Sequence, residues 1–473
     1  MPDGFSAPDA LATMPAVEIA RLVTTGALSA IEVVERTITR IGERNGVLNA
    51  VTESMADTAR RSAAEIDRKR RASEPIGPLA GVPFSVKSNI DVAGSATTHG
   101  IAALRNAIAP TDAPVVERLR RAGAIPIAHT NMPDLSVRFH TSSQLHGDTV
   151  NPWDARLTPG GSSGGDGVAV ATGMSALGVG NDAGGSVRVP ALFAGVSALK
   201  PTTGRLPSDR SIGPRDLTFA SQVVPVEGFL ARTVADLRIA LAVAAGPHPR
   251  DPRALPAPLS GPAPRTPTTV GVVVDPGGMG VHAGAETAVH TAARALEAAG
   301  YRLDFIDVPR LEETLAAYGG LIMTEFAQAW PTMQRLLGPN GRRYIELAME
   351  LGKPRDLVGY LELTAVRHGL QRAWTELLDT HPVILGPVYT GPVPPANYDI
   401  QGLEEHASCG RALRLCSATS FVGLPAVSVP VGLTDGVPQG VQVIANYFRE
   451  DLCLEAAEAI EAHAGFTLER IAA

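Results

Sequence analysis

Two glycine-rich turns carry the serines of this sequence that are best placed to act as nucleophiles. The first turn spans residues 158–166 and holds Ser162 and Ser163 between two pairs of glycines. The second spans residues 181–188 and holds Ser186 directly after two glycines. Because glycine has no Cβ, such turns let backbone N–H groups point into a cavity, as an oxyanion site requires. A flexible linker is the alternative for an isolated Gly/Ser run, but both turns lie between apolar segments that indicate ordered structure.

A serine nucleophile needs a base, and the sequence supplies a lysine more readily than a histidine. Lys87 ends the apolar run 79–86. Burial there would disfavour the charged amine and lower its pKa from ~10.4 towards the ~7–8 that suits a general base. A salt-bridged lysine at a strand end is an equally good interpretation from composition alone. Four histidines precede the turns, and none lies in a recognisable triad motif: His99, His129, His140 and His146.

Two competing motifs are excluded. Ser197 and Lys200 have the S-x-x-K spacing of penicillin-recognising enzymes, but that motif must begin a helix, and Pro201 follows at once. No G-x-x-x-x-G-K-[ST] motif is present either, which argues against a phosphate-binding loop.

Composition narrows the class of protein. The chain has 473 residues, of which 45% are apolar and 19% charged, so it can bury a large core. Its net charge of -7 leaves no basic footprint for nucleic acid. Three cysteines, Cys409, Cys416 and Cys453, form no C-x-x-C pair, which argues against disulfides and zinc. With neither a signal-peptide pattern nor an apolar run of roughly eighteen residues, we expect a cytoplasmic protein without a membrane span.

Periodicity predicts the elements that must position these residues. Residues 8–74 should be helical, with Ser29 and Glu32 forming a capping box, and the run 79–86 should be a buried strand. Strand–helix–strand alternation follows: helix 112–123 and strand 124–128, helix 168–174 and strand 177–180, then strand 270–274, helix 283–299 and strand 301–308, and strands at 383–385 and 426–430. We therefore expect an α/β fold with a large mixed, mostly parallel twisted sheet flanked by helices.

The chain should divide into four regions. They are an N-terminal helical region packed on the core at 1–74, a core at 75–245, a connector with eight prolines at 246–268, and the rest of the α/β core at 269–473. The last region includes a helical insertion at about 311–378 that is broken near 338–341. The proline-rich segment 386–400 is predicted to be a loop over the active site.

Taken together, the two turns and residues 199–202 resemble the amidase signature. The intervals of 75 residues from Lys87 to Ser162 and 24 residues from Ser162 to Ser186 are also those of that family. The resemblance covers most of the chain, through residues 81–87, 122–125, 151–153, 423–426 and 440–442. The combination is specific, whereas any single segment would be weak.

The resemblance implies a role for each site residue. Ser186 would be the acyl-forming nucleophile, Ser162 the bridging serine, usually on a cis peptide, and Lys87 the terminal base. The oxyanion hole would consist of the backbone N–H groups of Ala183, Gly184, Gly185 and Ser186. Asp182, Arg188 and Ser163 would support this site, with ordinary salt bridges as the alternative for the first two.

A proton relay is also required by the chemistry itself. An amine leaves only when it is protonated, so the proton taken from the nucleophile has to return to the substrate nitrogen. A hydroxyl such as that of Ser162 can both donate and accept, and so can carry this proton.

Departures from the family pattern bear on the subgroup. Asn181 stands where threonine is common, and residues 128–131 replace the usual Gly-Lys-Thr-Asn. Residues 220–228 also replace the segment expected of a glutamine-amidotransferase A-type subunit, so a stand-alone hydrolase is favoured over that complex. A non-catalytic scaffold of the same fold is disfavoured because all three triad positions are present.

We therefore expect a serine amidohydrolase that works through an acyl-enzyme without metal or organic cofactor, as a monomer or homodimer. The resemblance favours hydrophobic or aryl amides and extends to carbamates (urethanes). Four residues are predicted to contact the substrate: Ser136, Thr141, Ser142 and Tyr389.

Overall fold

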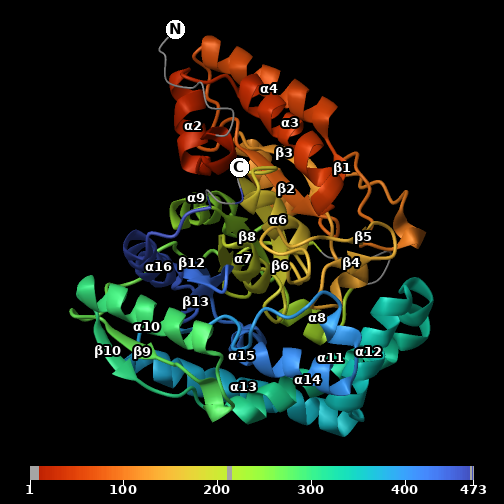
Figure 1. The fold of residues 1–473 in the computed structure, drawn as a ribbon, viewed down its shortest axis with the longest axis vertical. Helices are drawn as coiled ribbons and strands as arrows, with labels where there is room; N and C mark the ends of the chain where they lie inside the picture. The colour runs from red at the N-terminus through yellow and green to blue at the C-terminus, as the bar shows by residue number, and fades with distance from the viewer. Residues whose placement is uncertain (1–9, 210–215, 469–470, 472–473) are drawn as a thin grey trace.

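One mixed sheet lies at the centre of the computed structural model, which describes residues 10–209, 216–468 and 471 (Figure 1). Over these residues the sheet has 11 strands in the order β1-β3-β2-β6-β8-β7-β12-β13-β11-β9-β10. Their bounds are β1 Val51–Ser54, β2 Pro83–Lys87, β3 Ile125–Thr130, β6 Leu177–Asp182, β7 Ser197–Lys200, β8 Val226–Ala231, β9 Thr269–Val272, β10 Arg302–Phe305, β11 Val383–Pro387, β12 Ala426–Thr434 and β13 Val437–Ala445. A separate ribbon pairs β4 Ser142–Ser143 with β5 Gly147–Asp148.

Strand pairing combines two parallel blocks with an antiparallel centre. Parallel pairs join β3, β2 and β6 at one side of the sheet, and β11, β9 and β10 at the other. The other six pairs of this 11-stranded sheet are antiparallel. Five of them run through its centre from β6 to β11 by way of β8, β7, β12 and β13, and the sixth pairs β1 with β3 at one edge. The predicted fold class, a large mixed sheet flanked by helices, is confirmed.

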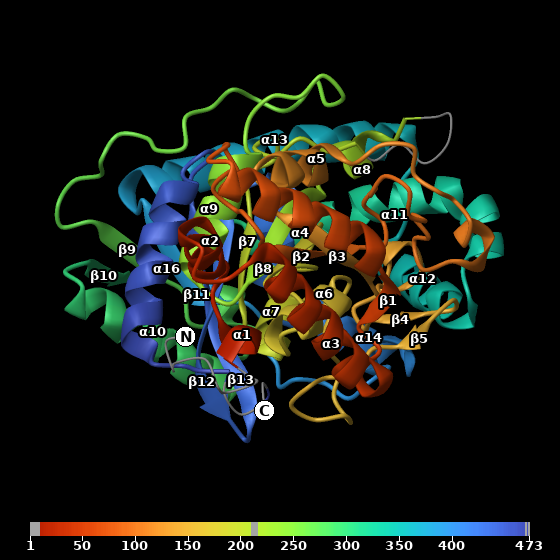
Figure 2. The ribbon, with the colours of Figure 1, turned by 90° about the horizontal axis from the view of Figure 1, so that it is seen from above.

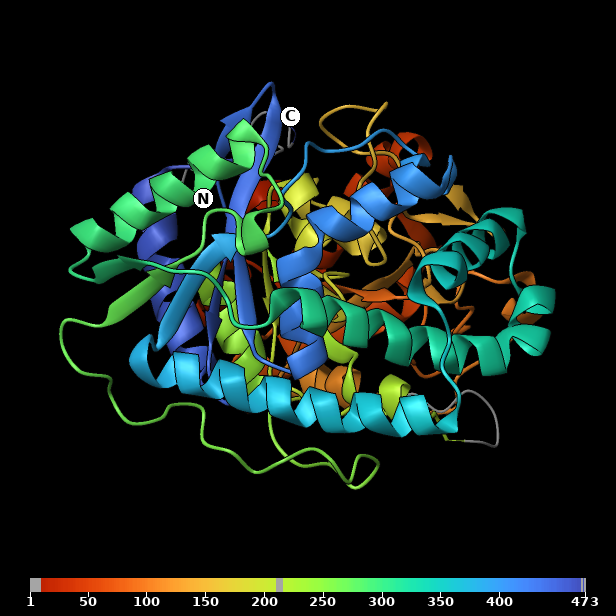
Figure 3. The ribbon, with the colours of Figure 1, turned by 90° about the horizontal axis from the view of Figure 1, so that it is seen from below.

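Helices cover both faces of this sheet. Their bounds are α1 Ala10–Thr13, α2 Ala16–Thr25, α3 Ala30–Leu48, α4 Ala56–Arg71, α5 Pro114–Arg121, α6 Gly164–Ala171, α7 Arg188–Ala194, α8 Phe219–Val223, α9 Val234–Ala244, α10 Ala283–Ala298, α11 Leu311–Leu336, α12 Pro339–Gly352, α13 Leu357–Thr380, α14 Leu403–Ala412, α15 Arg414–Val422 and α16 Glu450–Ala464. Figure 2 shows α16 towards the viewer, and Figure 3, from the other side, shows α13 there. None of the described helices is long and apolar enough to cross a membrane.

The alternation of side chains along β11 separates two apolar cores. Val383 and Leu385 pack in the core formed with α10 and α16, whereas Ile384 packs in the core formed with α11, α13 and α15. This is the period of two that a strand imposes on its side chains. Trp374 of α13 is fully buried in the second core. Of the helices within the predicted region 311–378, α11 and α13 therefore pack over the sheet.

Most predicted elements are present, and two differ. β2 ends at Lys87 as predicted, and α12 begins at Pro339, at the predicted break. The expectation of helices through 8–74 is wrong at β1, a four-residue strand that pairs antiparallel with β3. α6 begins at Gly164 rather than near residue 168, because Gly165 lets the helix approach the backbone: a Cβ there would lie 2.5 Å from Asn131 N.

The proline-rich stretch 246–268 contains no helix or strand and runs as an extended trace (Figure 3). It connects α9 to β9, and β9 belongs to the same 11-stranded sheet as β8, the last strand before this stretch. Proline cannot donate to a strand ladder, which accounts for the extended path. The division of the chain into four regions stays a prediction.

Candidate active site

Ser186 is half-buried in the wall of a cavity of about 600 Å³. The cavity lies between the second glycine-rich turn, the loop that contains Ser136, and helices α11, α12 and α14. Most of the side chains around it are apolar, among them Phe139, Leu315, Tyr318, Ile322, Met323, Phe326, Tyr344 and Ala348. Gly161, the neighbour of Ser162, also lines it, so the cavity adjoins both glycine-rich turns.

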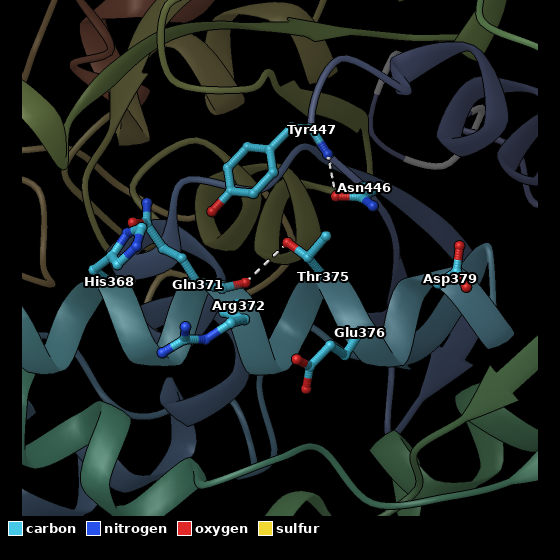
Figure 4. A pocket seen from close by; sticks show the side chains of 8 residues that line it. All are labelled: His368, Gln371, Arg372, Thr375, Glu376, Asp379, Asn446 and Tyr447. Carbon is cyan, nitrogen blue, oxygen red and sulfur yellow. Dashed lines mark hydrogen bonds between the residues drawn. The ribbon is translucent and has the colours of Figure 1, made fainter.

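A second hollow, of about 870 Å³, lies along α13 beside Asn446 and Tyr447 (Figure 4). Its side chains are mainly polar or charged: His368, Gln371, Arg372, Thr375, Glu376, Asp379, Asn446 and Tyr447. It shares no lining residue with the Ser186 cavity and includes neither serine, cysteine nor lysine. We therefore place the candidate active site in the Ser186 cavity.

Lys87 and Ser162 form a buried pair beneath this cavity. The Lys87 Nζ donates to Ser162 Oγ at 2.7 Å and to Asn181 Oδ1 at 2.8 Å, and Lys87 is fully buried. β2 lies between β3 and β6, which places its last residue beside the end of β6. The Gly161–Ser162 peptide is cis, as the resemblance implies. A neutral lysine at this distance can accept the proton of a serine hydroxyl.

Ser163 connects the two glycine-rich turns. Its backbone N–H donates to the carbonyl of Ser186 at 3.0 Å, and its Oγ donates to the carbonyl of Asn181 at 3.4 Å. It is fully buried. The structure thus gives it a role in fixing the turns, and its predicted role in orienting Lys87 stays a prediction.

The loop between β6 and α7 presents backbone N–H groups beside Ser186. Within the described part of the chain, the N–H groups of Ala183, Gly184 and Ser186 have no hydrogen-bond partner. Gly185, also predicted as an oxyanion donor, instead donates its N–H to Asp182 Oδ1 at 2.8 Å. The prediction for Gly185 is corrected on this point, because the carboxylate at the end of β6 turns that N–H away from the cavity.

Asp182 and Arg188 hold this loop in place through a buried ion pair. Arg188 donates to both carboxylate oxygens of Asp182, each at 3.0 Å, and both side chains are fully buried. Burial opposes the charge of Asp182, but the charge and hydrogen bonds of Arg188 outweigh it and keep the pKa of Asp182 below its ordinary value. The other guanidinium contacts were not predicted from the sequence: Thr419 Oγ1 at 2.7 Å, Gln442 Oε1 at 2.7 Å, Ser420 Oγ at 2.8 Å and the Cys416 carbonyl at 3.0 Å.

Of the four predicted substrate contacts, the structure places only Ser136 in the cavity lining. Thr141 donates its hydroxyl to the Gly160 carbonyl at 2.8 Å and is fully buried. Ser142 is buried in the ribbon of β4 and β5. Tyr389 stacks on Phe139 with the ring centroids 5.5 Å apart. None of these three residues lines the cavity, which corrects their prediction as substrate contacts.

The segment 386–400 does not lie over the cavity. It packs against residues 156–158, where Thr158 N donates to the Pro394 carbonyl at 3.0 Å and Ala396 N to the Arg156 carbonyl at 3.0 Å. None of its described residues lines the cavity. The prediction that this segment is a loop over the active site is therefore wrong. The segment runs along the loop of residues 156–158 instead.

Asp166 is a neighbour of Lys87 that the sequence did not reveal as part of the site. It is fully buried on α6, and Ser85 Oγ donates to its Oδ1 at 2.7 Å. Burial raises the pKa of Asp166 to about 7, although the Ser85 hydrogen bond and the Lys87 charge oppose this rise. The apolar stretch around Asp166 is the signal that marks its carboxyl as buried.

Comparisons with known proteins agree with this fold. The family model described as Amidase matches residues 32–454. An indoleacetamide hydrolase of Bradyrhizobium diazoefficiens is 38% identical over 458 residues, which cover 96% of this chain and 87% of that protein. The A-type subunit of the glutamyl-tRNA(Gln) amidotransferase of Deinococcus deserti is 32% identical, over 94% of this chain and 96% of that protein.

A solved structure of 6-aminohexanoate cyclic dimer hydrolase, complexed with substrate, superposes with a TM-score of 0.81 and 27% identity, over 98% of this chain and 100% of that one. Fold, site and comparisons define a hydrolase that acts on amide C–N bonds. The chain belongs to the amidase family.

Proposed function

We propose that this amidase hydrolyses uncharged amides with an apolar, aromatic acyl group, and that Ser186 is its nucleophile. The observation that carries the proposal is the position of Ser186 in a cavity lined by aromatic and aliphatic side chains, next to the turn that holds Ser162 and Lys87. The similarity to an indoleacetamide hydrolase supports it, because that name gives an aromatic primary amide as the substrate.

Acylation begins when Ser186 Oγ attacks the amide carbonyl carbon. The proton of Ser186 passes to Ser162, whose own proton passes to the neutral amine of Lys87. The N–H groups of Ala183, Gly184 and Ser186 stabilise the oxyanion of the tetrahedral intermediate, and each such donor contributes roughly 3 kcal/mol.

Collapse of the intermediate breaks the C–N bond. The leaving nitrogen takes a proton from Ser162, which is reprotonated by the Lys87 ammonium, so ammonia or an amine departs and Ser186 carries the acyl ester. A water molecule that gives its proton to the same relay then attacks the ester. The products are the free acid and the original hydroxyl of Ser186.

The charged residues at the cavity favour a neutral acyl group in its interior. Lys353, Arg355 and Arg411 belong to the lining but are exposed, so solvent and salt screen their charges. Arg138, the buried guanidinium of the lining, is paired with Asp399 at 2.7 Å. The α-ammonium and α-carboxylate of glutamine would have to enter an apolar interior, where unpaired charges are costly. We therefore favour hydrolysis of aryl amides over the glutaminase reaction of an amidotransferase.

A three-substrate panel tests this proposal. For an aromatic primary amide such as indole-3-acetamide, kcat/KM is expected to exceed that for glutamine by about 10²-fold or more, because only the aromatic amide leaves no unpaired charge in the cavity. A preference for glutamine would contradict the proposal. An aryl carbamate of similar size is the third substrate, and turnover comparable to that of the amide would extend the proposal to urethanes.

The pH profile of the wild-type enzyme gives a second prediction. Lys87 can accept a proton only as the neutral amine, so kcat/KM is expected to rise from neutral into mildly alkaline pH. Rates measured between about pH 5 and about pH 9 with the aromatic amide check this expectation. A flat profile over that range would contradict a lysine base.

A further inference from the structure

Three hydrogen bonds connect the buried lysine to the wall of the cavity. Lys87 Nζ donates to Asn181 Oδ1 at 2.8 Å, Asn181 Nδ2 donates to Asn89 Oδ1 at 3.0 Å, and Asn89 Nδ2 donates to Ser136 Oγ at 3.1 Å. The four residues come from the end of β2, the turn after it, the end of β6, and the short helical turn Asp134–Ser136. We call this set the asparagine chain.

The chemistry of lysine fixes the direction of every bond in the asparagine chain. A lysine ammonium can only donate, so Asn181 must turn its Oδ1 to Lys87 and its Nδ2 to Asn89. Asn89 must then accept through Oδ1, which turns its Nδ2 to Ser136. When the amine is neutral, an N–H still occupies the bond to Asn181, and the single lone pair is left for the Ser162 hydroxyl at 2.7 Å.

At the cavity end of the asparagine chain, Ser136 is held so that its hydroxyl proton is free to point into the cavity. Its Oγ accepts from Asn89, so its O–H is left to donate, and the half-buried side chain lines the cavity. Leu135 and Ser136 have φ values of 50° and 63°, in the left-handed region. For residues other than glycine this conformation is strained and is typical of functional positions.

We propose that the asparagine chain links the catalytic base to the substrate. In this proposal Asn181 is a positioning residue that holds the Lys87 amine with its lone pair toward Ser162. Ser136, oriented by Asn89, donates a hydrogen bond to an acceptor atom of the bound substrate. The inference rests on the proposed function, since it takes Lys87 as the base.

Two other titratable side chains lie near Lys87, and a third lies on the neighbouring strand. Asp166 on α6 and His99 in the loop after β2 both feel the Lys87 charge. His129 on β3 precedes Thr130, the register partner of Lys87, so its side chain points to the other face of the sheet. Burial and the Lys87 charge lower the pKa of His99 to about 4, and burial lowers the pKa of His129. Both histidines are therefore neutral near pH 7, while burial raises the pKa of Asp166 above its ordinary value. A substitution at Asn181 leaves all three in place, so a difference from wild type reports on Asn181.

Asn181→Asp tests the lysine end of the asparagine chain. The variant keeps an acceptor for Lys87, loses the donor to Asn89, and puts a negative charge against the amine, which favours the ammonium form. The acid limb of kcat/KM is expected to move up by about one pH unit or more, with activity recovering at higher pH. A purely structural role would lower activity at every pH, and an unshifted limb overturns the inference.

A double-mutant cycle tests the cavity end. Asn89→Ala and Ser136→Ala are each expected to raise KM about three- to tenfold, and the double variant no more than either alone, because both remove the same oriented donor. Ser221 is the matched control: it lines the same cavity, but its hydroxyl contacts Glu325 at 3.4 Å, so Ser221→Ala should show no coupling to Asn89→Ala.

The outcomes separate this inference from the proposed function. The proposal that Asn89 orients Ser136 toward the substrate is wrong if the effects of the Asn89 and Ser136 variants are additive. It is also wrong if Ser136→Ala leaves KM unchanged. A Ser186→Ala enzyme that stayed active would contradict the proposed function itself. An inactive Ser186→Ala enzyme beside an Asn181→Asp enzyme with an unshifted acid limb overturns only the inference.

Discussion

Ser186→Ala is expected to lower kcat by about 10⁶-fold on any amide that the enzyme hydrolyses. Without the hydroxyl no acyl ester can form, and the remaining rate would come from substrate binding and oxyanion stabilisation alone. The side chain is half-buried in a cavity and packs in none of the apolar cores. The variant should therefore fold as the wild type does, which its thermal midpoint can check.

A fluorophosphonate probe identifies the nucleophile independently of the substrate. The wild-type chain is expected to form one covalent adduct, seen as a mass shift of a peptide that contains Ser186, and Ser186→Ala should form none. Ser221→Ala is the control, since Ser221 lies in the same cavity away from the Lys87 and Ser162 pair. Equal labelling of Ser186→Ala would show that another residue is the nucleophile.

The pairing of Lys87 with Ser162 could be predicted from one local signal together with the family resemblance. A continuous apolar run predicts a buried strand, and its polar last residue then has to meet a partner at the sheet edge. The family intervals name that partner, and the two atoms lie 2.7 Å apart. Periodicity likewise predicted α10 and the helices α11 to α13.

Contacts that depend on backbone direction could not be predicted. Ser136, Thr141 and Ser142 are close in sequence, yet only Ser136 lines the cavity, because the left-handed conformations at Leu135 and Ser136 redirect the chain. The sequence also could not show that Gly185 donates its N–H to Asp182, because this depends on the backbone conformation of the loop. Residue types alone do not give the direction of an N–H group.

Contacts between segments that are far apart in the sequence could not be predicted either. Thr419 and Gln442, which bind Arg188, lie 231 and 254 residues further along the chain. The four-residue strand β1 has no periodicity of its own and exists because β3 offers an unpaired edge. The asparagine chain had one signal, the asparagine at position 181 where the family commonly has threonine, but its partners came only from the structure.

Arg188→Leu is expected to destabilise the protein by about 3–5 kcal/mol, because it leaves Asp182 as an uncompensated buried charge. That loss is a large part of the about 5–15 kcal/mol that stabilises a typical folded protein. The guanidinium also holds α15 and β13 against the Ser186 loop through Thr419 and Gln442. Urea unfolding followed by tryptophan fluorescence measures the shift in midpoint.

Arg21→Leu on α2 is the matched control. Arg21 forms a salt bridge with Glu18 at 2.6 Å, but both side chains are exposed, and pairs of this kind contribute little to stability. Its unfolding midpoint should stay at the wild-type value. An Arg188→Leu midpoint equally close to wild type would contradict the expected effect of the buried pair.

The pH dependence of this loss tests its electrostatic origin. In the wild type Arg188 keeps the pKa of Asp182 below its ordinary value, so the pair stabilises the fold above the unfolded pKa of about 3.9 and loses this effect only as the pH falls below it. In Arg188→Leu, burial without the guanidinium raises the pKa of Asp182, so the folded variant gains stability as that carboxyl becomes protonated. The difference in stability between wild type and variant should therefore narrow as the pH is lowered from about 8 to about 5, whereas a difference caused by lost packing alone would stay constant.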